Sequence, residues 1–310
     1  MRGGAVSARF AAGLDGGGTK TTLCCLDGAG QVMYEGSFGP MNINSPDRGA
    51  VLAALAAIAR QILSLEAMGR ACAGLVVAAA GTSHPEARDF IGEGLKQGGY
   101  RGPFTLRGDH EAALRGAVGP EGAILIAGTG AICYGRRADG HTARAGGWGY
   151  LLGDEGGGYA LGREMLGAIL RAEDGRGQPT RLKELVYEER GLRDPGDIIR
   201  FAYDQEQGKA WVAGLAELLP RALTMGDQAA KDIARKAADD LFSLCEAVLA
   251  RLSLQEGRLA LMGGVLGNIT CIREGLIARL AEGFPALQVI SPKHSAAWGA
   301  ADLARELYLD

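Results

Sequence analysis

The sequence predicts an α/β protein of two lobes, each a mixed sheet with flanking helices, with a helical insertion in the second lobe. Three observations lead to this prediction. Apolar segments with the spacing of strands and helices alternate along the first half of the chain. A glycine-rich turn between two apolar strands occurs twice, roughly 110 residues apart, which indicates a weak internal repeat. Residues 159–253 are almost wholly helical in pattern, and 310 residues suffice for two separate cores.

The first lobe is expected to follow the order β-β-β-α-β-α-β-α. The stretch "LDGGGTKTTLCCLD" reads as the turn and second strand of a hairpin, and "GQVMYEGSFG" as a third strand. Residues 47–69 are apolar at helical spacing, and "CAGLVVAAAG" is a buried strand. A helix at 85–97 with Pro85 in its first turn, the strand "FTLRGD" and the helix "HEAALRGAVG" complete the lobe.

The second lobe opens in the same way. The stretch "AILIAGTGAICYGRRADGHTARAGG" predicts three strands, and the helical insertion follows them. A strand with a glycine turn, "RLALMGGVLGN", then leads to a helix, the strand "LQVISP" and a last helix, "AAWGAADLARELYL". No low-complexity linker is present, so we expect a hinge between packed domains, residues 1–118 with 295–310 and residues 119–294.

Composition excludes several classes of function. The 33 Lys and Arg against 36 Asp and Glu give a net charge of −3 without long runs of one sign, which favours neither nucleic acid nor an anionic membrane surface as a partner. The N-terminus has no sustained apolar stretch, and no run approaches the roughly 18 apolar residues of a membrane span. Six cysteines without CxxC or Cys/His spacing are expected to be buried free thiols in a reducing cytoplasm: Cys24, Cys25, Cys72, Cys133, Cys245 and Cys271.

The glycine turns are candidates for anion binding. In "DGGGTKT" a backbone without Cβ atoms can bring consecutive N–H groups to an anion, and Thr19 and Lys20 add a hydroxyl and a charge. The spacing fits neither a Walker A loop nor a Rossmann fingerprint, and one such turn alone could be an ordinary hairpin. With "AGTGA" at 127–131 and the strand-end pair Gly263 and Gly264, three turns indicate a nucleotide.

Two acids stand beside these turns. Asp15 precedes the first turn and could hold Mg²⁺ through water, or else satisfy backbone amides of the turn. Asp109 follows a strand and begins a helix, so N-capping and a catalytic role at the strand's C-terminal end are both open.

Five segments in this order closely resemble the N-acetylglucosamine kinase branch of the BadF/BadG/BcrA/BcrD ATPase family, within the superfamily of actin, sugar kinases and heat-shock chaperones. They are "LDGGGTKT", "RGDHEAALRGA", "LIAGTGAICYG", "GGWGYLLGDEGGGYALGRE" and "LMGGVLGN". The resemblance runs from about residue 12 to the C-terminus and implies the actin-like ATPase (ribonuclease H-like) fold, with nucleotide and sugar in the cleft between the lobes.

The resemblance also implies roles for individual residues. Asp109 would be the base that takes the proton of the sugar 6-hydroxyl, and Asp15 would lie near Mg²⁺. The residues implied for ATP are Gly17, Gly18, Thr19, Lys20, Gly128, Thr129, Gly130, Gly263, Gly264 and Asn268. The residues implied for the sugar are Asn42, Asp109, Gly130, Ala131, Gly147, Trp148, Gly149 and Asp154.

Several alternatives stay open at this point. Asn44 competes with Asn42, Trp148 could be a core aromatic, and Glu155 is expected to cap the following helix. The acceptor could be glucosamine rather than N-acetylglucosamine, and the loop at 81–83 is among those that would distinguish them. Other functions are an ATPase that activates a dehydratase or reductase, disfavoured because no cysteine precedes the AGTG turn, and a non-catalytic sugar or nucleotide sensor. The resemblance and the apolar helices of the second lobe favour a homodimer.

Overall fold

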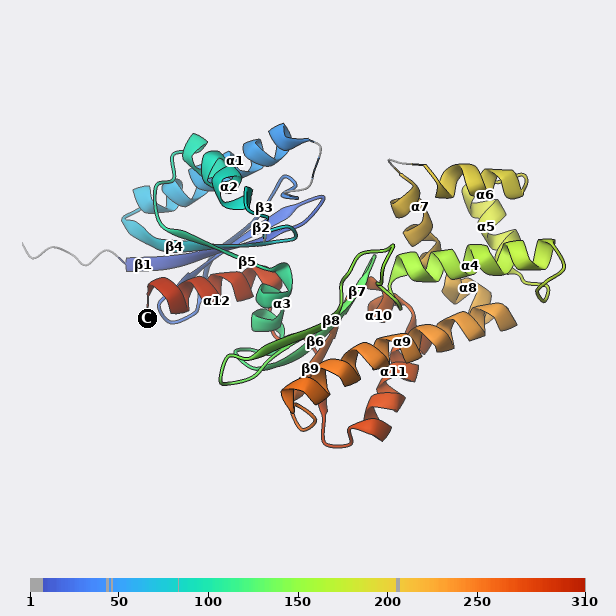
Figure 1. The fold of residues 1–310 in the computed structure, drawn as a ribbon. Helices are drawn as coiled ribbons and strands as arrows, with labels where there is room; N and C mark the ends of the chain where they lie inside the picture. Colours follow the sequence, from blue (N-terminus) through green and yellow to red (C-terminus); the bar gives the residue numbers. More distant parts are fainter. Residues whose placement is uncertain (1–7, 43–44, 46, 83, 205–206, 310) are drawn as a thin grey trace, which may run out of the picture. The chain divides into compact units, whose positions relative to one another are not determined.

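The fold was analysed in a computed structural model that describes residues 8–42, 45, 47–82, 84–204 and 207–309 (Figure 1). The chain divides into two compact units. Unit 1 comprises residues 1–121 and 292–310, and unit 2 comprises residues 122–291. Each unit contains one five-stranded mixed sheet with helices packed on it.

Unit 1 is built on the strand order β3-β2-β1-β4-β5. The antiparallel strands are β1 (Ala8–Gly16), β2 (Thr21–Asp27) and β3 (Val32–Phe38), and the strands parallel to β1 are β4 (Arg70–Ala79) and β5 (Phe104–Arg107). The helices are α1 (Arg48–Ala67), α2 (Ala87–Gln97), α3 (Asp109–Ala117) and α12 (Ala296–Tyr308). Helices α1 and α2 pack on one face of the sheet, and α3 and α12 pack on the other.

Unit 2 has the strand order β10-β9-β6-β7-β8. Its strands are β6 (Gly122–Ala127), β7 (Ala131–Arg136), β8 (Thr142–Gly146), β9 (Arg258–Met262) and β10 (Gln288–Ile290). The helical insertion contains α4 (Gly158–Glu173), α5 (Leu182–Arg190), α6 (Pro195–Ala202), α7 (Gly208–Gly214), the 3-10 helix η1 (Leu215–Leu218), α8 (Leu219–Thr224) and α9 (Gln228–Leu252). Helices α10 (Gly264–Asn268) and α11 (Thr270–Gly283) lie between β9 and β10.

The two sheets share one topology. In each, two consecutive hairpins supply three antiparallel strands, and two later strands add in parallel beside the first strand. Strands β1 and β2 therefore correspond to β6 and β7, and the glycine turns between them occupy the same place in the two units. The internal repeat predicted from the sequence is confirmed.

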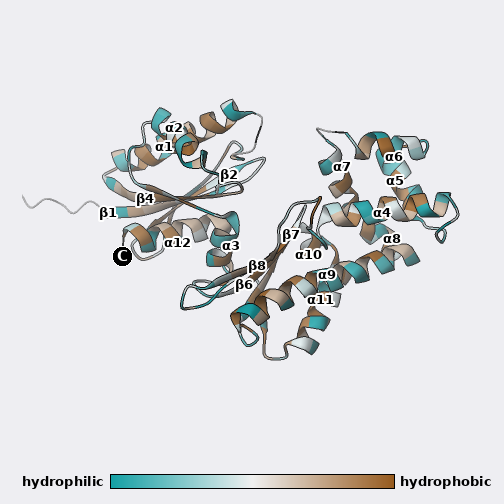
Figure 2. Ribbon diagram, in the orientation of Figure 1, coloured by the Kyte–Doolittle hydropathy of each residue, from teal (hydrophilic) through white to brown (hydrophobic). Residues whose placement is uncertain are grey.

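The longest apolar helix of unit 1 belongs to its core. Helix α1 has the length and apolar composition to span a membrane, which the sequence analysis did not expect of any segment. Its buried side chains, including Val51, Leu55, Ile58 and Ile62, pack with sheet residues such as Leu75 in one hydrophobic cluster. Hydrophobic residues likewise concentrate on the strands of both sheets (Figure 2), so burial against the sheet accounts for the composition of α1.

Two smaller expectations are corrected. Pro85 does not lie in the first turn of α2, because that helix begins at Ala87 after the N-cap Glu86. The cysteines are free, but only four are buried, since Cys72 is half-buried and Cys271 is exposed. Burial raises the pKa of the Cys24 thiol to about 12, so this group stays a neutral thiol that behaves as a small apolar side chain.

Candidate functional site

The β1–β2 turn of unit 1 is open to solvent. Residues 18–20 are exposed, and a Cβ atom at Gly18 would meet no other atom within 4 Å. The turn is closed by the Gly17 N–H, which donates to the Lys20 carbonyl at 3.0 Å. The Met41 N–H supports it by donating to the Gly17 carbonyl at 2.9 Å. The exposed backbone of the turn can therefore receive an anion.

Asp15 and Asp109 influence each other near this turn. Burial and the charge of Asp109 raise the pKa of Asp15, and Lys20 opposes this effect. Hydrogen bonding with His110 lowers the pKa of Asp109: the His110 N–H donates to Asp109 Oδ1 at 2.8 Å, and His110 Nδ1 lies 3.3 Å from the same oxygen. Asp109 is thus an ionised, half-exposed carboxylate with a second acid close to it.

The helix that carries Asp109 does not use it as a cap. The N-cap of α3 is Gly108, whose N–H donates to the Glu111 carboxylate at 3.0 Å, and Asp109 is the first helical residue. The N-capping explanation is therefore wrong. In the first turn of α3 the Asp109 carboxylate also lies at the positive end of the helix dipole, which stabilises its negative charge.

Residues near the predicted sugar loops of unit 1 differ in what they can contribute. Asn42 is half-buried and follows the buried Met41, whereas its competitor Asn44 lies outside the described residues. The Thr82 hydroxyl lies within hydrogen-bond distance of the carbonyls of Ala79 and Arg107, at 3.1 and 2.9 Å, and shares its one proton between the ends of β4 and β5. Ser83 also lies outside the described residues.

The corresponding β6–β7 turn of unit 2 is held by the start of α4. The Gly158 N–H donates to the Gly128 carbonyl at 2.8 Å, and the Tyr159 N–H donates to the Thr129 carbonyl at 2.9 Å. A Cβ atom at Gly157 would lie 2.6 Å from the Gly130 carbonyl carbon. The second glycine run of the sequence thus allows α4 to contact the turn directly.

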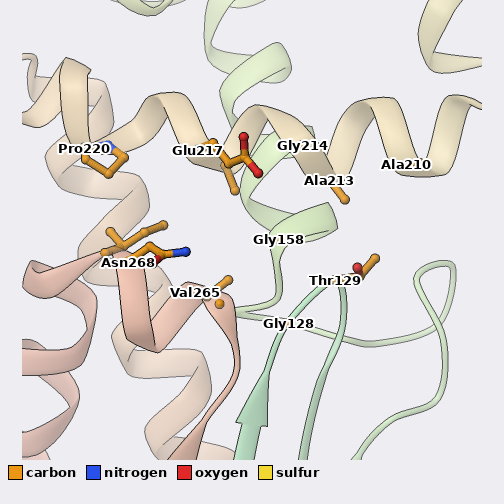
Figure 3. Close-up of a pocket in the computed structure, with 13 residues that line it drawn as sticks. Gly128, Thr129, Gly158, Ala210, Ala213, Gly214, Glu217, Pro220, Val265 and Asn268 are labelled. Atoms are coloured by element: carbon orange, nitrogen blue, oxygen red, sulfur yellow. The ribbon is translucent and has the colours of Figure 1, made fainter. Parts of the chain in front are cut away.

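A cavity of about 590 Å³ opens beside this turn (Figure 3). The β6–β7 turn, the start of α4, helices α7, η1 and α8, and the region of α10 supply its walls, and its lining residues are Gly128, Thr129, Gly158, Ala210, Ala213, Gly214, Ala216, Glu217, Pro220, Gly264, Val265, Asn268 and Ile269. Four residues predicted for the nucleotide line it: Gly128, Thr129, Gly264 and Asn268. The volume is in the range of small-molecule sites.

Gly263 and Gly130 do not line the cavity but shape its surroundings. Gly263 has φ +97°, and a Cβ atom there would overlap the Ala127 carbonyl. This close approach brings the end of β9 against the end of β6. A Cβ atom at Gly130 would overlap the Asp154 carboxylate. Gly263 is therefore required by backbone packing, whereas Gly130 leaves room for the Asp154 side chain.

The loop after β8 brings most of the predicted sugar residues of unit 2 together. The Gly147 N–H donates to the Ala131 carbonyl at 2.8 Å, and Gly147 and Gly149 both have positive φ. Asp154 is buried and has φ 63°, a conformation that costs of order 1–3 kcal/mol and is concentrated at functional sites. Among the described residues, no donor pairs with its carboxylate, which lies against Gly130. Asp154 is thus an unpartnered acceptor at this loop.

Two alternatives for this loop are wrong. Trp148 is 62% exposed and is not a core aromatic; its indole instead carries the Arg144 guanidinium 4.1 Å from the ring centroid. Glu155 does not cap α4, because the N-cap is Gly157 and no side chain caps that helix.

Sequence reasoning missed the wall that the insertion contributes. Ala210, Ala213, Gly214 and Glu217 follow helical spacing on one face of α7 and η1, and this stripe of small residues ending in an acid lines the cavity. Lys209 also escaped notice; its Nζ lies 4.9 Å from the centroid of the Tyr150 ring, which packs edge-on against Tyr159. The helical spacing of these small residues is visible in the sequence, but the neighbouring residues do not indicate which part of the protein this face packs against.

Comparison with known proteins gives a consistent result. A model of the BadF/BadG/BcrA/BcrD ATPase family matches residues 12–304. An N-acetylmuramic acid/N-acetylglucosamine kinase of Clostridium acetobutylicum is 34% identical over 306 residues, 96% of this chain and 98% of that protein. An N-acetyl-D-glucosamine kinase of Dictyostelium discoideum is 27% identical and covers 94% of this chain and 96% of its own.

A solved structure shows the same fold. The crystal structure of a Chromobacterium violaceum protein assigned to the N-acetylglucosamine kinases has a TM-score of 0.72 and 25% identity, covering 96% of this chain and 99% of that one. The two-lobed α/β fold predicted from the sequence is thereby confirmed.

Proposed function

Since the chain belongs to the BadF/BadG/BcrA/BcrD ATPase family, we propose that it is an ATP-dependent kinase that phosphorylates the 6-hydroxyl of N-acetylglucosamine. The relatives from Clostridium and Dictyostelium are named for this sugar, which supports the choice over glucosamine. The observation that carries the proposal is the cavity of unit 2, in which the AGTG turn meets α10 and the small-residue face of the insertion.

The nucleotide is assigned to this cavity and to both glycine turns. Adenosine would lie between α7–η1 and α10, where small side chains leave space and Asn268 and the Glu217 carboxylate offer polar contacts. The backbone at Gly128 and Thr129 would receive phosphates, as would the exposed turn at 17–20 with its Lys20 ammonium.

Magnesium, which the family implies, fits the acids of unit 1. Two neighbouring carboxylates, with the pKa of Asp15 raised partly by the charge of Asp109, gain from a cation close by. No group of three or more His, Cys, Asp or Glu side chains in the described part of the chain could hold a metal, so phosphates and water would supply the other ligands. Bound Mg²⁺ would neutralise charge on the β- and γ-phosphates.

Asp109 is assigned as the general base. Its pKa is held below the ordinary value by the hydrogen bonds of His110, so the carboxylate is ionised and able to accept a proton at neutral pH. In the transfer, the sugar oxygen forms a bond to the γ-phosphorus while the bond from that phosphorus to the β–γ bridging oxygen breaks. The hydroxyl proton passes to Asp109, and ADP leaves.

The sugar is assigned to Asn42 and Asp109 of unit 1 and to the loop of unit 2. The Asp154 carboxylate, buried and without a partner among the described residues, would accept hydrogen bonds from sugar hydroxyls. Gly130, Ala131, Gly147 and Gly149 would offer backbone groups at close approach, and the exposed Trp148 an apolar face.

Features of the described chain favour this proposal over its alternatives. A non-catalytic sensor would not need an ionised Asp109 close to Asp15. Since both acids are present, a catalytic function is favoured over a sensor. An activator with an iron–sulfur cluster would need exposed cysteines near the AGTG turn, but Ile126 and Ala127 precede that turn and the nearby Cys133 is buried. ATP supply and free thiols favour a cytoplasmic location.

The test is phosphoryl transfer by the wild type and Asp109→Ala. Steady-state ADP formation with N-acetylglucosamine, glucosamine, glucose and N-acetylmannosamine is expected to be fastest with the first sugar, and the variant is expected to lose about 10²–10⁴-fold in kcat. Asp139→Ala is the matched control. Asp139 is also an aspartate, but it lies in the exposed turn between β7 and β8, where it pairs with Arg137 and has no predicted role in the site. Turnover of Asp109→Ala equal to the wild type would refute the base, and no turnover with any of the sugars would refute the kinase.

A further inference from the structure

Arg144 and Trp148 form a stacked pair at the sugar loop of unit 2. Arg144 lies on the edge strand β8, two residues before the glycines that begin the loop. Its guanidinium carbon is 4.1 Å from the centroid of the Trp148 ring. Trp148 as a whole is nevertheless 62% exposed. A stacked guanidinium is held in one plane, so its N–H groups point outward from the edge of that plane.

The charge of Arg144 is not neutralised by the protein. Among the described residues, no carboxylate lies within 4.0 Å of it, whereas Arg137 on the same hairpin pairs with Asp139 at 2.6 Å. A second cation is close by, because Arg251 Nη1 donates to the Arg144 carbonyl at 3.4 Å. The loop therefore carries a preoriented positive group with unfilled donors.

Three other arginines lie over aromatic rings, and the comparison separates packing from binding. Arg200 lies over Phe201, which packs against the core cluster of unit 2, and the other two pairs are in unit 1. Arg48 lies over Phe90 and Arg88 lies over Phe104. Phe90 is 5% exposed and Phe104 packs against the same core cluster, so these arginines cover the hydrophobic core of unit 1. Trp148 belongs to no such cluster among the described residues and stands in a glycine loop with the unpartnered Asp154. Core coverage does not explain the Arg144–Trp148 pair.

We propose that Arg144 forms a carboxylate subsite beside the sugar, and that the acceptors of this kinase include amino sugars with a carboxylate substituent. Arg binds carboxylates through two parallel hydrogen bonds, and a stacked Arg loses little freedom in doing so. N-acetylmuramic acid meets the requirement, since it is N-acetylglucosamine with a lactyl ether, and the Clostridium relative is named for both sugars. This inference rests on the proposed sugar-kinase function.

The experiment compares kcat/KM for N-acetylmuramic acid, its neutral lactyl amide and N-acetylglucosamine. The wild type is expected to prefer the acid to the amide. Arg144→Gln is expected to lower the ratio of kcat/KM for the acid to that for N-acetylglucosamine about tenfold or more, because a charge-assisted hydrogen bond is lost. Arg144→Lys, which keeps the charge without the planar fork, is expected to give an intermediate ratio.

Arg251→Gln is the matched control, since it removes the neighbouring positive charge and leaves the stacked pair in place. Its ratio is expected to equal that of the wild type. If Arg144→Gln fails to fold, the proposal is tested by two other measurements. They are the preference of the wild type for the acid over the amide, and the acid-to-N-acetylglucosamine ratio of kcat/KM in Arg144→Lys. An unchanged ratio in the Arg144 variants, or no preference for the acid, overturns the carboxylate subsite while phosphorylation of N-acetylglucosamine upholds the kinase. Phosphorylation of none of these sugars overturns both.

Discussion

The two glycine turns occupy equivalent positions in sheets of one topology, but their surroundings differ. The β1–β2 turn of unit 1 is exposed and is supported by one backbone bond from Met41, with Asp15 at the end of its first strand and Asp109 after the last strand of the sheet. In unit 2 the position equivalent to Asp15 is Ile126, and Ser291 follows the last strand. The β6–β7 turn is instead held by α4 and walled by the insertion.

This difference separates two tasks that phosphoryl transfer requires. Unit 1 supplies the charged groups, which act on the γ-phosphate and the acceptor hydroxyl in the proposed mechanism. Unit 2 supplies a shaped cavity, lined mainly by small and apolar residues with Glu217 as its one charged lining residue, which suits a nucleoside. In the proposed mechanism one repeated sheet supports both tasks, and the residues added at the strand ends decide which task each copy performs.

The largest effect is expected from breaking the support of the acids in unit 1. Asp302 of α12 is buried and pairs with Arg115 of α3, the helix that begins at Asp109. Asp302→Asn is expected to lower the free energy of unfolding by about 3 kcal/mol, because the buried Arg115 guanidinium loses its buried carboxylate partner and keeps only the half-exposed Glu306. Urea denaturation measures this loss. Glu306→Gln removes the half-exposed partner of Arg115 and is expected to cost less than about 1 kcal/mol; equal losses would contradict the account.

The next largest effect, a loss of nucleotide affinity, is expected from pushing α4 away from the β6–β7 turn of unit 2. Gly157→Ala places a Cβ atom 2.6 Å from the backbone of Gly130 and is expected to cost about 1–3 kcal/mol in nucleotide binding as the turn shifts. Isothermal titration with a non-hydrolysable ATP analogue measures this change. Gly28→Ala, in the β2–β3 turn of unit 1, is the control, since a Cβ atom there meets nothing within 4 Å and the residue lies outside the predicted nucleotide turns. Binding weakened as much by Gly28→Ala as by Gly157→Ala would contradict the role of α4 in holding the turn.

Glu217 tests whether the cavity recognises the nucleoside through more than its shape. Glu217→Gln is expected to raise KM for ATP about tenfold with little change in kcat, because a hydrogen bond to a charged acceptor is weakened away from the reacting atoms. Steady-state kinetics with ATP varied at saturating sugar measures both constants. Loss of kcat with unchanged KM would place Glu217 in catalysis and contradict the division between the units.

The smallest effect concerns the pKa of Asp109. Hydrogen bonding with His110 is the largest cause that lowers this pKa, so His110→Ala raises it towards the ordinary value. A base acts only when ionised, so activity is lost as pH falls through its pKa, and the acid limb of log kcat against pH is expected to move to higher pH in the variant. A pH profile of wild type and variant measures the shift. A move to lower pH would contradict the assigned base.

Local pattern was enough to predict most elements of the fold. Alternating apolar runs and glycine turns gave the hairpins of both sheets, because strand pairing across a short turn depends on neighbouring residues. The helical insertion was predicted as a whole, since its periodicity is continuous. The start of α2 was misplaced by two residues, which is within the usual uncertainty of a helix end.

The candidate site was predictable where it depends on glycine and less so elsewhere. Turn glycines and the Asp154 loop stood out in the sequence because few other residues allow such close backbone approach. Arg144 did not, although Trp148 is only four residues away, because its residue type and spacing do not show that the two side chains stack. Glu217 and Lys209 did not, because their importance depends on which surface each faces after the insertion has packed. Contacts between residues distant in sequence carry no local signal.

The division between the units is tested most directly by measuring the affinity of Asp109→Ala and Gly157→Ala for a non-hydrolysable ATP analogue alongside their turnover. Asp109→Ala is expected to bind the analogue as tightly as the wild type, within about twofold, while its turnover is lost. Gly157→Ala is expected to bind the analogue more weakly. Loss of nucleotide affinity in Asp109→Ala with unchanged affinity in Gly157→Ala would contradict the account.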